Sequence, residues 1–386
     1  MKKKGKKVLL IILAVLALIV VFCAAALKIY ADSFKVERVE EYLFEAECGE
    51  YSYGAAETFC SVLKPRPGAA CTGIRKGDLV GRNFDWVYDE SAEFVVRTPA
   101  ENGRHATMGV ASMLTGLEDR AVDSGRISAQ YILLPFLLVD GINDAGLACS
   151  VNVAPALDTV PTSGTNPGAE PLCTAYAVRY ILDYASDVDE AIGLLENRDL
   201  YAITYNDYHF ELHWLISDRE KSAVVETVDN ELRIVVFDNP SPEEGDKPVV
   251  MTNFFLSEDG LTPHAIGTER YDIVCDGYGR INGEDSMLDL LKDVWMTRLY
   301  SGELDPFWYS EYYEDLSGYG FGCYSSESDK SEIDEIVRLE TELFETGERS
   351  GIVYQTVHTS VYNLKDLTLK VVAQENGEEF VFKLEG

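Results

Sequence analysis

The sequence predicts an α+β domain in which β-sheets are covered by helices. Strand patterns occur early, in the middle and at the end of the chain, and helical patterns separate them, which is typical of layered α+β folds. The strand patterns lie at 78–85, 93–97, 211–216, 222–226, 232–236, 249–252, 353–361, 367–372 and 379–384. The helical patterns lie at 170–197, 285–299 and 331–346.

The composition allows a large folded domain and excludes one class of partner. Of 386 residues 46% are hydrophobic, which is enough to bury a sizeable core. The chain has 33 Lys and Arg against 66 Asp and Glu, a formal net charge of -33. Nucleic-acid binding needs clustered basic residues that neutralise phosphates. We therefore expect no nucleic-acid partner.

The first 30 residues differ from the rest of the chain. Five lysines among residues 2–7 precede an unbroken apolar run at 8–27. A basic flank before such a run is an export signal or a membrane anchor. The run exceeds the roughly 7–15 residues of a cleavable signal and reaches the about 20 that span a bilayer, so an anchor through residues 8–27 is favoured. Small residues at 24–26 also allow signal cleavage. Either way, the sequence predicts an extracytoplasmic protein, membrane-anchored or secreted.

Residues 31–70 form an acidic pre-segment. It ends in a proline-broken stretch at 64–70, which cannot be helix or central strand and is predicted to be an exposed linker. From Cys71 the pattern changes to strands at 78–85 and 93–97, with a turn at 75–78 before the first of them. The sequence thus predicts three parts: 1–30, the pre-segment 31–70 and a main domain at 71–386.

The first helical pattern, at 170–197, contains a predicted start signal in its middle. Ser186 and Asp189 match a capping box, after which apolar residues recur at helical spacing. We therefore expect two helices in this stretch.

Eight cysteines in an exported chain raise the question of disulfides. Cys23 belongs to the apolar run and Cys71 is considered separately below. The remaining six match no small disulfide framework, and both buried thiols and bridges stay open for them. They are Cys48, Cys60, Cys149, Cys173, Cys275 and Cys323. No CxxC pair or zinc-ligand spacing occurs, so we expect no metal and no cofactor.

Cys71 is a candidate nucleophile because of the residues that follow it. A hairpin through the turn at 75–78 returns the chain past Cys71, so Arg82 and Asp85 can lie close to its sulfur. A neighbouring positive charge lowers the pKa of a thiol, and a carboxylate can hold an amino group in place. Taken alone, a cysteine near an arginine and an aspartate is more often structural than catalytic.

A nucleophilic cysteine needs a base, and histidines are scarce. The chain has five, and the pair His209 and His213 lies in a strand-like stretch, which favours one strand face over a helical metal motif. The base can instead be the α-amino group of Cys71 itself, with a reference pKa of roughly 7.7–8.0. That amine exists only after the bond between Ala70 and Cys71 is cut.

An ordered set of motifs from Cys71 onward resembles the choloylglycine hydrolases (bile salt hydrolases) and penicillin V acylases, which are N-terminal-nucleophile (Ntn) amidases. The similarity covers residues 71 to about 385, and the order of the motifs is more specific than any one of them. The matching segments are 71–73, 81–86, 143–148, 151–152, 212–218, 225–226, 250–253 and 268–271.

The resemblance implies a fold and an activity. The fold is the Ntn-hydrolase four-layer αββα sandwich, in which two antiparallel sheets are covered by helices. The activity is hydrolysis of a linear carbon–nitrogen amide bond through a thioester on Cys71. The substrate is a small N-acyl compound of the bile salt conjugate, penicillin V or N-acyl amino acid type.

The resemblance also implies roles for further residues. The backbone N–H of Asn152 and the side chain of Asn253 stabilise the oxyanion, and Asp85 orients the amino group. Arg82 and Arg270 supply positive charge near the sulfur. Asn rather than Tyr at position 152 leans towards the bile-salt type.

The sequence departs from the family in three places. Seventy residues precede Cys71, so its exposure requires autoproteolysis or another protease. The interval 253–270 is shorter than the hairpin that bile salt hydrolases use for tetramer contacts, which leaves the oligomeric state open. The stretch 305–329 is an insertion, best read as a solvated loop. Two alternatives remain: a membrane-tethered surface binding protein with an unprocessed, inactive Ntn fold, or an acyltransferase.

Overall fold

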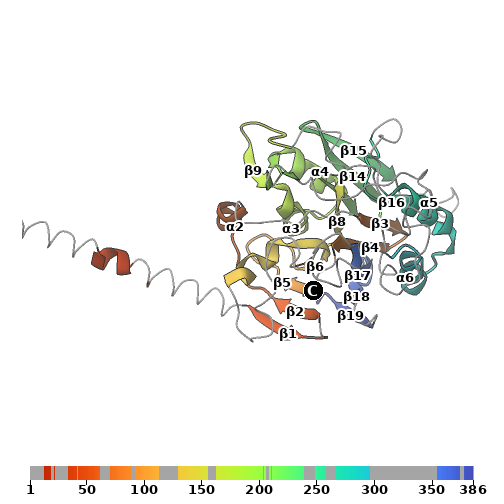
Figure 1. Cartoon of the computed structure of the whole chain (residues 1–386), viewed down its shortest axis with the longest axis horizontal. Helices are drawn as coiled ribbons and strands as arrows, with labels where there is room; N and C mark the ends of the chain where they lie inside the picture. The colour runs from red at the N-terminus through yellow and green to blue at the C-terminus, as the bar shows by residue number, and fades with distance from the viewer. Residues whose placement is uncertain are drawn as a thin grey trace, which may run out of the picture.

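Two large β-sheets pack face to face in the middle of the protein (Figure 1). The structure is a computed structural model. It describes residues 13–18, 21, 34–40, 42–60, 70–87, 92–112, 129–154, 162–202, 204–205, 208–209, 211–238, 248–257, 267–295, 354–373 and 378–385.

The larger sheet has nine strands in the order β1-β2-β5-β6-β7-β8-β13-β14-β15. Its pairings are antiparallel apart from β2 with β5, which run parallel. The strands are β1 Lys35–Arg38, β2 Leu43–Glu47, β5 Glu93–Thr98, β6 Thr107–Ser112, β7 Leu138–Asn143, β8 Ala148–Ala154, β13 Glu211–Ser217, β14 Lys221–Val228 and β15 Glu231–Asp238.

The smaller sheet has six strands, all antiparallel, in the order β16-β3-β4-β17-β18-β19. The hairpin between β3 and β4 turns at Gly77, whose φ of 60° is the left-handed conformation that glycine tolerates. The strands are β3 Ala70–Lys76, β4 Leu79–Val87, β16 Val249–Met251, β17 Tyr354–Asn363, β18 Thr368–Ala373 and β19 Glu379–Lys383.

Helices cover the outer face of each sheet. On the larger sheet, Trp214 packs in one buried cluster with Ile181 and Leu195. On the smaller sheet, Ile74 packs with Leu291. The helices over the larger sheet are α2 Tyr53–Cys60, α3 Ala177–Tyr184 and α4 Val188–Glu196, and those over the smaller sheet are α5 Thr268–Gly277 and α6 Glu284–Lys292.

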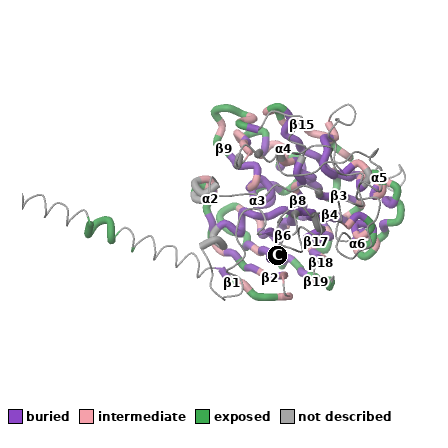
Figure 2. The backbone as a smooth tube through the Cα atoms, in the orientation of Figure 1, coloured by how far each residue is buried: buried purple, intermediate pink, exposed green. Residues whose placement is uncertain are grey.

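The inner faces of the two sheets share a third cluster. Met108 and Val110 of the larger sheet pack there with Leu369 and Val371 of the smaller sheet. Buried residues accordingly run through the strands of both sheets (Figure 2). The layers are helix, sheet, sheet and helix, which confirms the predicted αββα sandwich, with one parallel pairing added.

Short elements complete the chain. The strands β9 and β10 form a parallel pair, and β11 and β12 form a hairpin. These elements are β9 Glu170–Cys173, β10 Arg198–Tyr201, β11 Thr204–Tyr205, β12 Tyr208–His209 and the 3-10 helices η3 Ala129–Phe136, η5 Thr174–Tyr176 and η6 Tyr278–Arg280.

The structure corrects several sequence predictions. The predicted helical stretch begins as strand β9, because these four residues pair with β10. The second helix is capped one residue later than expected: Asp187 accepts the N–H of Glu190 at 2.8 Å, and Glu190 accepts the N–H of Ser186 at 2.8 Å. His209 and His213 lie in strands of different sheets rather than on one strand face.

Several structured regions were not anticipated. They include strands β6, β7 and β8 of the larger sheet and two further regions. One is α5, whose sequence shows no apolar stripe, and the other is the segment at 34–60, which contributes β1, β2 and α2 to the fold. In the sequence, this segment was expected only as an acidic pre-segment.

Several predictions fall outside the described residues. They concern the linker at 64–69, the insertion at 305–329, the helix at 331–346 and most of the apolar run at 8–27. Residues 13–18 of that run are helical. Within the part of the chain that the structure describes, no helix is long and apolar enough to cross a membrane.

The cysteines whose side chains the structure describes carry thiols rather than disulfides. Cys48, Cys149 and Cys173 are buried and Cys275 is half-buried. For these four, the alternative of buried or partly buried thiols therefore holds. The side chains of Cys23, Cys60 and Cys323 lie outside the described residues.

Candidate active site

Cys71 lies at the start of β3, between β4 and β16, with its side chain directed towards the larger sheet. Only 1% of the residue is exposed. Gly73, two residues further on the same strand face, leaves little space: a Cβ there would lie 3.3 Å from Leu215 on β13. The sulfur is therefore enclosed between the two sheets.

Arg82 on β4 reaches the sulfur, as the hairpin predicts. Its Nη2 donates to Cys71 Sγ at 3.5 Å and to the carbonyl of Val151 at 2.5 Å, while its Nη1 forms an ion pair with Asp140 at 3.1 Å. Both charged side chains are almost fully buried. The positive charge is thus fixed beside the thiol.

Burial dominates the ionisation of the thiol in the uncut chain. It raises the pKa of Cys71, and the nearby charge of Arg82 opposes this effect without cancelling it. The intact chain therefore holds a neutral thiol at neutral pH. A base that takes the proton locally is needed before the sulfur can attack.

Asn253 and Arg270 meet at the backbone of Cys71. The N–H of Cys71 donates to Asn253 Oδ1 at 2.8 Å, and Arg270 Nη2 donates to the same oxygen at 2.8 Å. Arg270 Nη1 donates to the carbonyl of Cys71 at 2.7 Å and to Thr72 Oγ1 at 3.0 Å. Arg270 therefore contacts the carbonyl of Cys71 directly and its N–H through Asn253 Oδ1.

Asp85 lies on the same side as Arg270. Its Oδ2 is 3.7 Å from Arg270 Nη1, and its backbone carbonyl is 3.8 Å from the Cys71 sulfur. In the uncut chain, the nitrogen of Cys71 bonds to Asn253, as given above, so the orienting role of Asp85 stays a prediction for the cut form.

Gly267 makes the approach of Arg270 possible. It precedes α5 with a φ of 79°, and a Cβ at this position would lie 2.6 Å from Arg270 Nη2. A side chain here would therefore collide with the guanidinium that holds the Cys71 backbone.

Asn152 and Asn253 connect the two sheets beside Cys71. The Nδ2 of Asn152 donates to the carbonyls of Met251 at 3.1 Å and Thr252 at 3.0 Å. The Nδ2 of Asn253 donates to the carbonyl of Val153 at 2.7 Å. An amide nitrogen has two N–H groups, so Asn253 retains one for an oxyanion, while both of Asn152 are used. The oxyanion role that the resemblance implies for the Asn152 backbone stays a prediction.

A row of buried charges continues from Arg82 away from the sulfur, and sequence analysis missed it. Asp140 Oδ2 contacts His358 Nε2 at 3.1 Å, and His358 Nδ1 contacts Glu93 Oε2 at 2.8 Å. Tyr362 donates to the other oxygen of Asp140. These residues come from β7, β17 and β5, so no local pattern brings them together.

The pKa values of His358 and Asp140 are shifted by their charged neighbours in this row. Burial alone lowers the pKa of His358, but the hydrogen bonds and charges of Asp140 and Glu93 outweigh it and raise the pKa. Burial alone raises the pKa of Asp140, but His358 and Arg82 outweigh it and lower the pKa to about 2. Charges of alternating sign thus fix Arg82 beside Cys71.

A second missed group holds the backbone around Asn253. His213 Nε2 donates to the carbonyl of Thr252 at 2.8 Å. The carboxylate of Glu226 accepts the N–H groups of Leu256 at 2.8 Å and Ser257 at 3.0 Å. His213 and Glu226 lie opposite each other on β13 and β14, so the larger sheet positions the chain that carries Asn253.

The four layers are the αββα fold that the resemblance to Ntn amidases implies, and Cys71 lies at the start of a strand of the smaller sheet, with its backbone nitrogen held by Asn253. Residues 71–255 match the model of the linear amide C–N hydrolases, choloylglycine hydrolase family. The predicted relationship is confirmed for residues 71–255, which match this family of linear amide C–N hydrolases.

Solved structures that match the chain include two variants of conjugated bile acid hydrolase from Clostridium perfringens. One has a TM-score of 0.46 at 16% identity and covers 82% of this chain and 92% of its own. The other has a TM-score of 0.45 at 16% identity, covering 81% and 92%. The penicillin V acylase from Agrobacterium tumefaciens has a TM-score of 0.35 at 15% identity, covering 81% and 86%. No curated protein sequence matches the chain significantly.

Proposed function

We propose that the protein is an exported cysteine amidase whose nucleophile, Cys71, becomes active when the bond after Ala70 is cut. The observation that carries the proposal is the position of the Cys71 nitrogen, which bonds to Asn253 while the attached sulfur lies beside Arg82. Among the described residues, no histidine or carboxylate side chain forms a hydrogen bond with the sulfur. A free α-amine at this nitrogen supplies the missing base.

The first half of the reaction forms a thioester. The sulfur attacks the carbonyl carbon of the amide while the α-amine takes the thiol proton. Negative charge develops on the carbonyl oxygen, and N–H groups of Asn152 and Asn253 stabilise it. The ammonium then protonates the leaving nitrogen, the carbon–nitrogen bond breaks, and the amine departs.

The second half releases the acid. The α-amine accepts a proton from water, and the resulting nucleophile attacks the thioester carbonyl. The carbon–sulfur bond breaks, the sulfur regains its proton, and a carboxylic acid leaves. An amine that entered in place of water would receive the acyl group instead, so product analysis with an added amine distinguishes hydrolysis from acyl transfer.

The substrate is proposed to be a small N-acyl amide. Bile salt conjugates, penicillin V and N-acyl amino acids represent the three types to compare. The comparison has a built-in control, because Cys71→Ser keeps the shape of the site and replaces the nucleophile.

The decisive experiment is N-terminal sequencing and intact-mass analysis of the purified protein, followed by turnover of the substrate panel. We expect a chain beginning at Cys71 that hydrolyses at least one amide, and Cys71→Ser that hydrolyses none. A stable uncut chain without turnover would instead support the inactive binding protein.

Export is a separate part of the proposal. Its support is the basic flank at 2–7 and the apolar run at 8–27. Cell fractionation of the full chain and of a chain lacking residues 1–30 tests it. Recovery of the full chain in the cytosolic fraction would contradict export.

A further inference from the structure

We infer that cutting before Cys71 produces a two-chain enzyme in which the N-terminal chain remains bound as a structural subunit through residues 34–60. The inference rests on the proposed cut. The inference goes beyond that cut because it assigns a permanent partner to the catalytic part. The partner is a segment of this same chain, and it covers the edge of β5 and one face of α3. Figure 1 shows β1, β2 and α2 against the body of the molecule.

The segment completes the larger sheet. Strand β2 pairs in parallel with β5 along its whole length, residue 43 with 93 through residue 47 with 97. Backbone bonds extend the pairing at both ends: Glu93 N–H donates to the carbonyl of Tyr42 at 2.8 Å, and Cys48 N–H donates to the carbonyl of Arg97 at 2.9 Å. Without the segment, the edge of β5 would present unpaired backbone groups.

Buried polar contacts hold the first residue of α2, Tyr53, and Tyr51, two residues before it, against α3. The hydroxyls of Tyr51 and Tyr53 donate to the two oxygens of Asp183, each at 2.6 Å. Asp183 is fully buried and also pairs with Arg179 at 3.2 Å. Loss of the segment would leave this buried carboxylate with fewer donors, which is costly.

Apolar side chains of the segment form part of the main core. Phe34, Leu43, Phe44 and Ala46 are each at most 7% exposed. Phe44 stacks on Phe94 of β5 with ring centroids 5.2 Å apart. Departure of the segment would expose these side chains and the core surface beneath them, so the hydrophobic effect favours retention after the peptide bond is broken.

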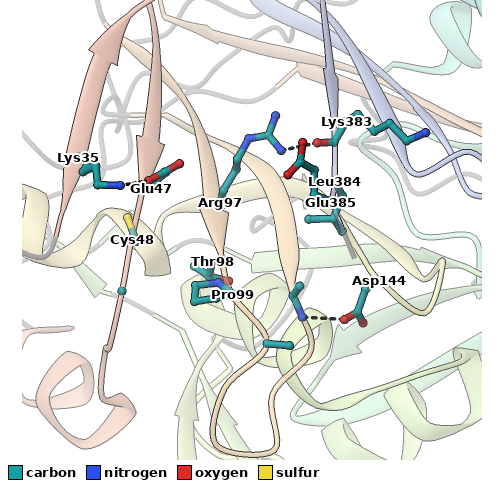
Figure 3. A pocket seen from close by; sticks show the side chains of 13 residues that line it. Lys35, Glu47, Cys48, Arg97, Thr98, Pro99, Asp144, Lys383, Leu384 and Glu385 are labelled. Carbon is teal, nitrogen blue, oxygen red and sulfur yellow. Dashed lines mark hydrogen bonds and ion pairs between the residues drawn. The ribbon is translucent and has the colours of Figure 1, made fainter.

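A cavity of about 680 Å³ lies where the two chains would meet. Figure 3 shows Lys35, Glu47 and Cys48 of the segment on one side and Arg97 with Lys383 on the other. Arg97 donates both to Glu45 of the segment and to the carbonyl of Lys383. Cys48 is only 1% exposed at this seam, so its thiol reports whether the segment is in place.

The segment also supports the charge row described above. Tyr42 holds the backbone of Glu93, and the side chain of Glu93 holds His358. The N-terminal chain is therefore expected to be needed for full activity of the cut enzyme. Because the N-terminal chain stays bound, the cut enzyme also keeps any membrane attachment that residues 1–30 provide.

The test separates docking of the segment from natural processing. A cleavage site for a sequence-specific protease is placed between residues 61 and 69 of the full chain carrying Cys71→Ala, which cannot cut itself. After complete cleavage, size-exclusion chromatography in native buffer and mass-spectrometric mapping of iodoacetamide labelling are compared with the same sample in urea. We expect co-elution of both pieces and Cys48 labelling at least about 100-fold slower than in urea.

Variants of the segment test these contacts one at a time. Ala46→Asp places a charge in the core beneath β2 and is expected to release the N-terminal piece after cleavage. Tyr51→Phe with Tyr53→Phe is a milder variant that keeps the shape and removes two hydrogen bonds to Asp183, and it should speed Cys48 labelling. Lys35→Ala, on the exposed outer strand, is the matched control. It should change neither the co-elution of the pieces nor the rate of Cys48 labelling.

The outcomes distinguish the two proposals. Separation of the pieces at micromolar concentration in native buffer overturns the inference, whatever the natural enzyme does. Co-elution in this experiment, with a natural chain that is never cut at Cys71, overturns the proposed function and leaves the docking of the segment established. A naturally cut enzyme that keeps residues 34–60 through purification supports both.

Discussion

Arg82 places its Nη2 atom 3.5 Å from the sulfur of Cys71. The same guanidinium is held from behind by Asp140 at 3.1 Å. The charge beside the proposed nucleophile is therefore set by the strand hairpin and by a carboxylate from the opposite sheet.

Replacing Arg82 should reduce activity by more than any accompanying loss of stability explains. We expect Arg82→Gln to lower kcat/KM by about 100-fold or more, because one preorganised charged donor at a reacting centre is worth about that much. Steady-state kinetics on the panel substrate measure this. Arg219→Gln, at an exposed position on the chain, is the control and should leave kcat/KM within about twofold of the parent enzyme.

Asp140 should matter for both folding and activity. Asp140→Asn leaves Arg82 buried beside a neutral partner, and breaking such a pair costs about 3–5 kcal/mol of unfolding free energy. Tyr362→Phe removes only the hydroxyl that donates to Asp140 and should cost about 1.5–3 kcal/mol. Urea denaturation compares the two. An Asp140→Asn enzyme as stable as the parent would contradict the buried pair.

The raised pKa of His358 predicts a pH-dependent stability. A group whose pKa is higher in the folded state than its ordinary 6.5 stabilises the fold fully below pH 6.5, and this stabilisation is lost as pH rises through the folded value. We expect the unfolding free energy to fall as pH increases above 6.5. Urea denaturation between pH 6 and 9 tests this, and His358→Gln should flatten the curve. An unchanged slope in that variant would assign the effect to another group.

Asn253 should be needed for the chemical step. Asn253→Ala removes the proposed oxyanion donor and the acceptor for the Cys71 nitrogen, so kcat should fall by about 100–1,000-fold. Asn282→Ala, at an exposed position before α6, is the control. A higher KM with an unchanged kcat would show that Asn253 only binds substrate.

Two glycines should respond to the same substitution with opposite signs. A Cβ on Gly109 would lie 2.3 Å from the carbonyl of Asp140 and 3.0 Å from the Cα of Gly141. Gly109→Ala should therefore push β6 from β7 and cost about 1–3 kcal/mol. Gly193 in α4 has open space around it, so Gly193→Ala should stabilise by up to about 1 kcal/mol. Thermal unfolding measures both.

Local pattern predicted much of the fold. The strands of the smaller sheet and of β13 to β15 follow from alternating apolar residues bounded by turns, and these predictions are confirmed. Helix α5 was missed because its residues show no apolar stripe: Arg270 points inward to meet Cys71, whereas amphipathic patterns assume that charges face water.

The sequence by itself determined which charged side chain lies beside the proposed nucleophile, Cys71. Cys71 and Arg82 are 11 residues apart on one hairpin, and the turn at Gly77 fixes the register that brings them together. Local geometry is sufficient there because the pairing of two adjacent strands leaves few alternatives.

Only the tertiary structure decided what supports that pair. Asp140, His358 and Glu93 come from three strands of two sheets, and their contacts exist because packing of the sheets encloses polar groups that must then find partners. The same holds for residues 34–60, which read as an acidic pre-segment in the sequence. Their place at the edge of β5 depends on a sheet that the rest of the chain must first build, and no local pattern encodes such a distant edge.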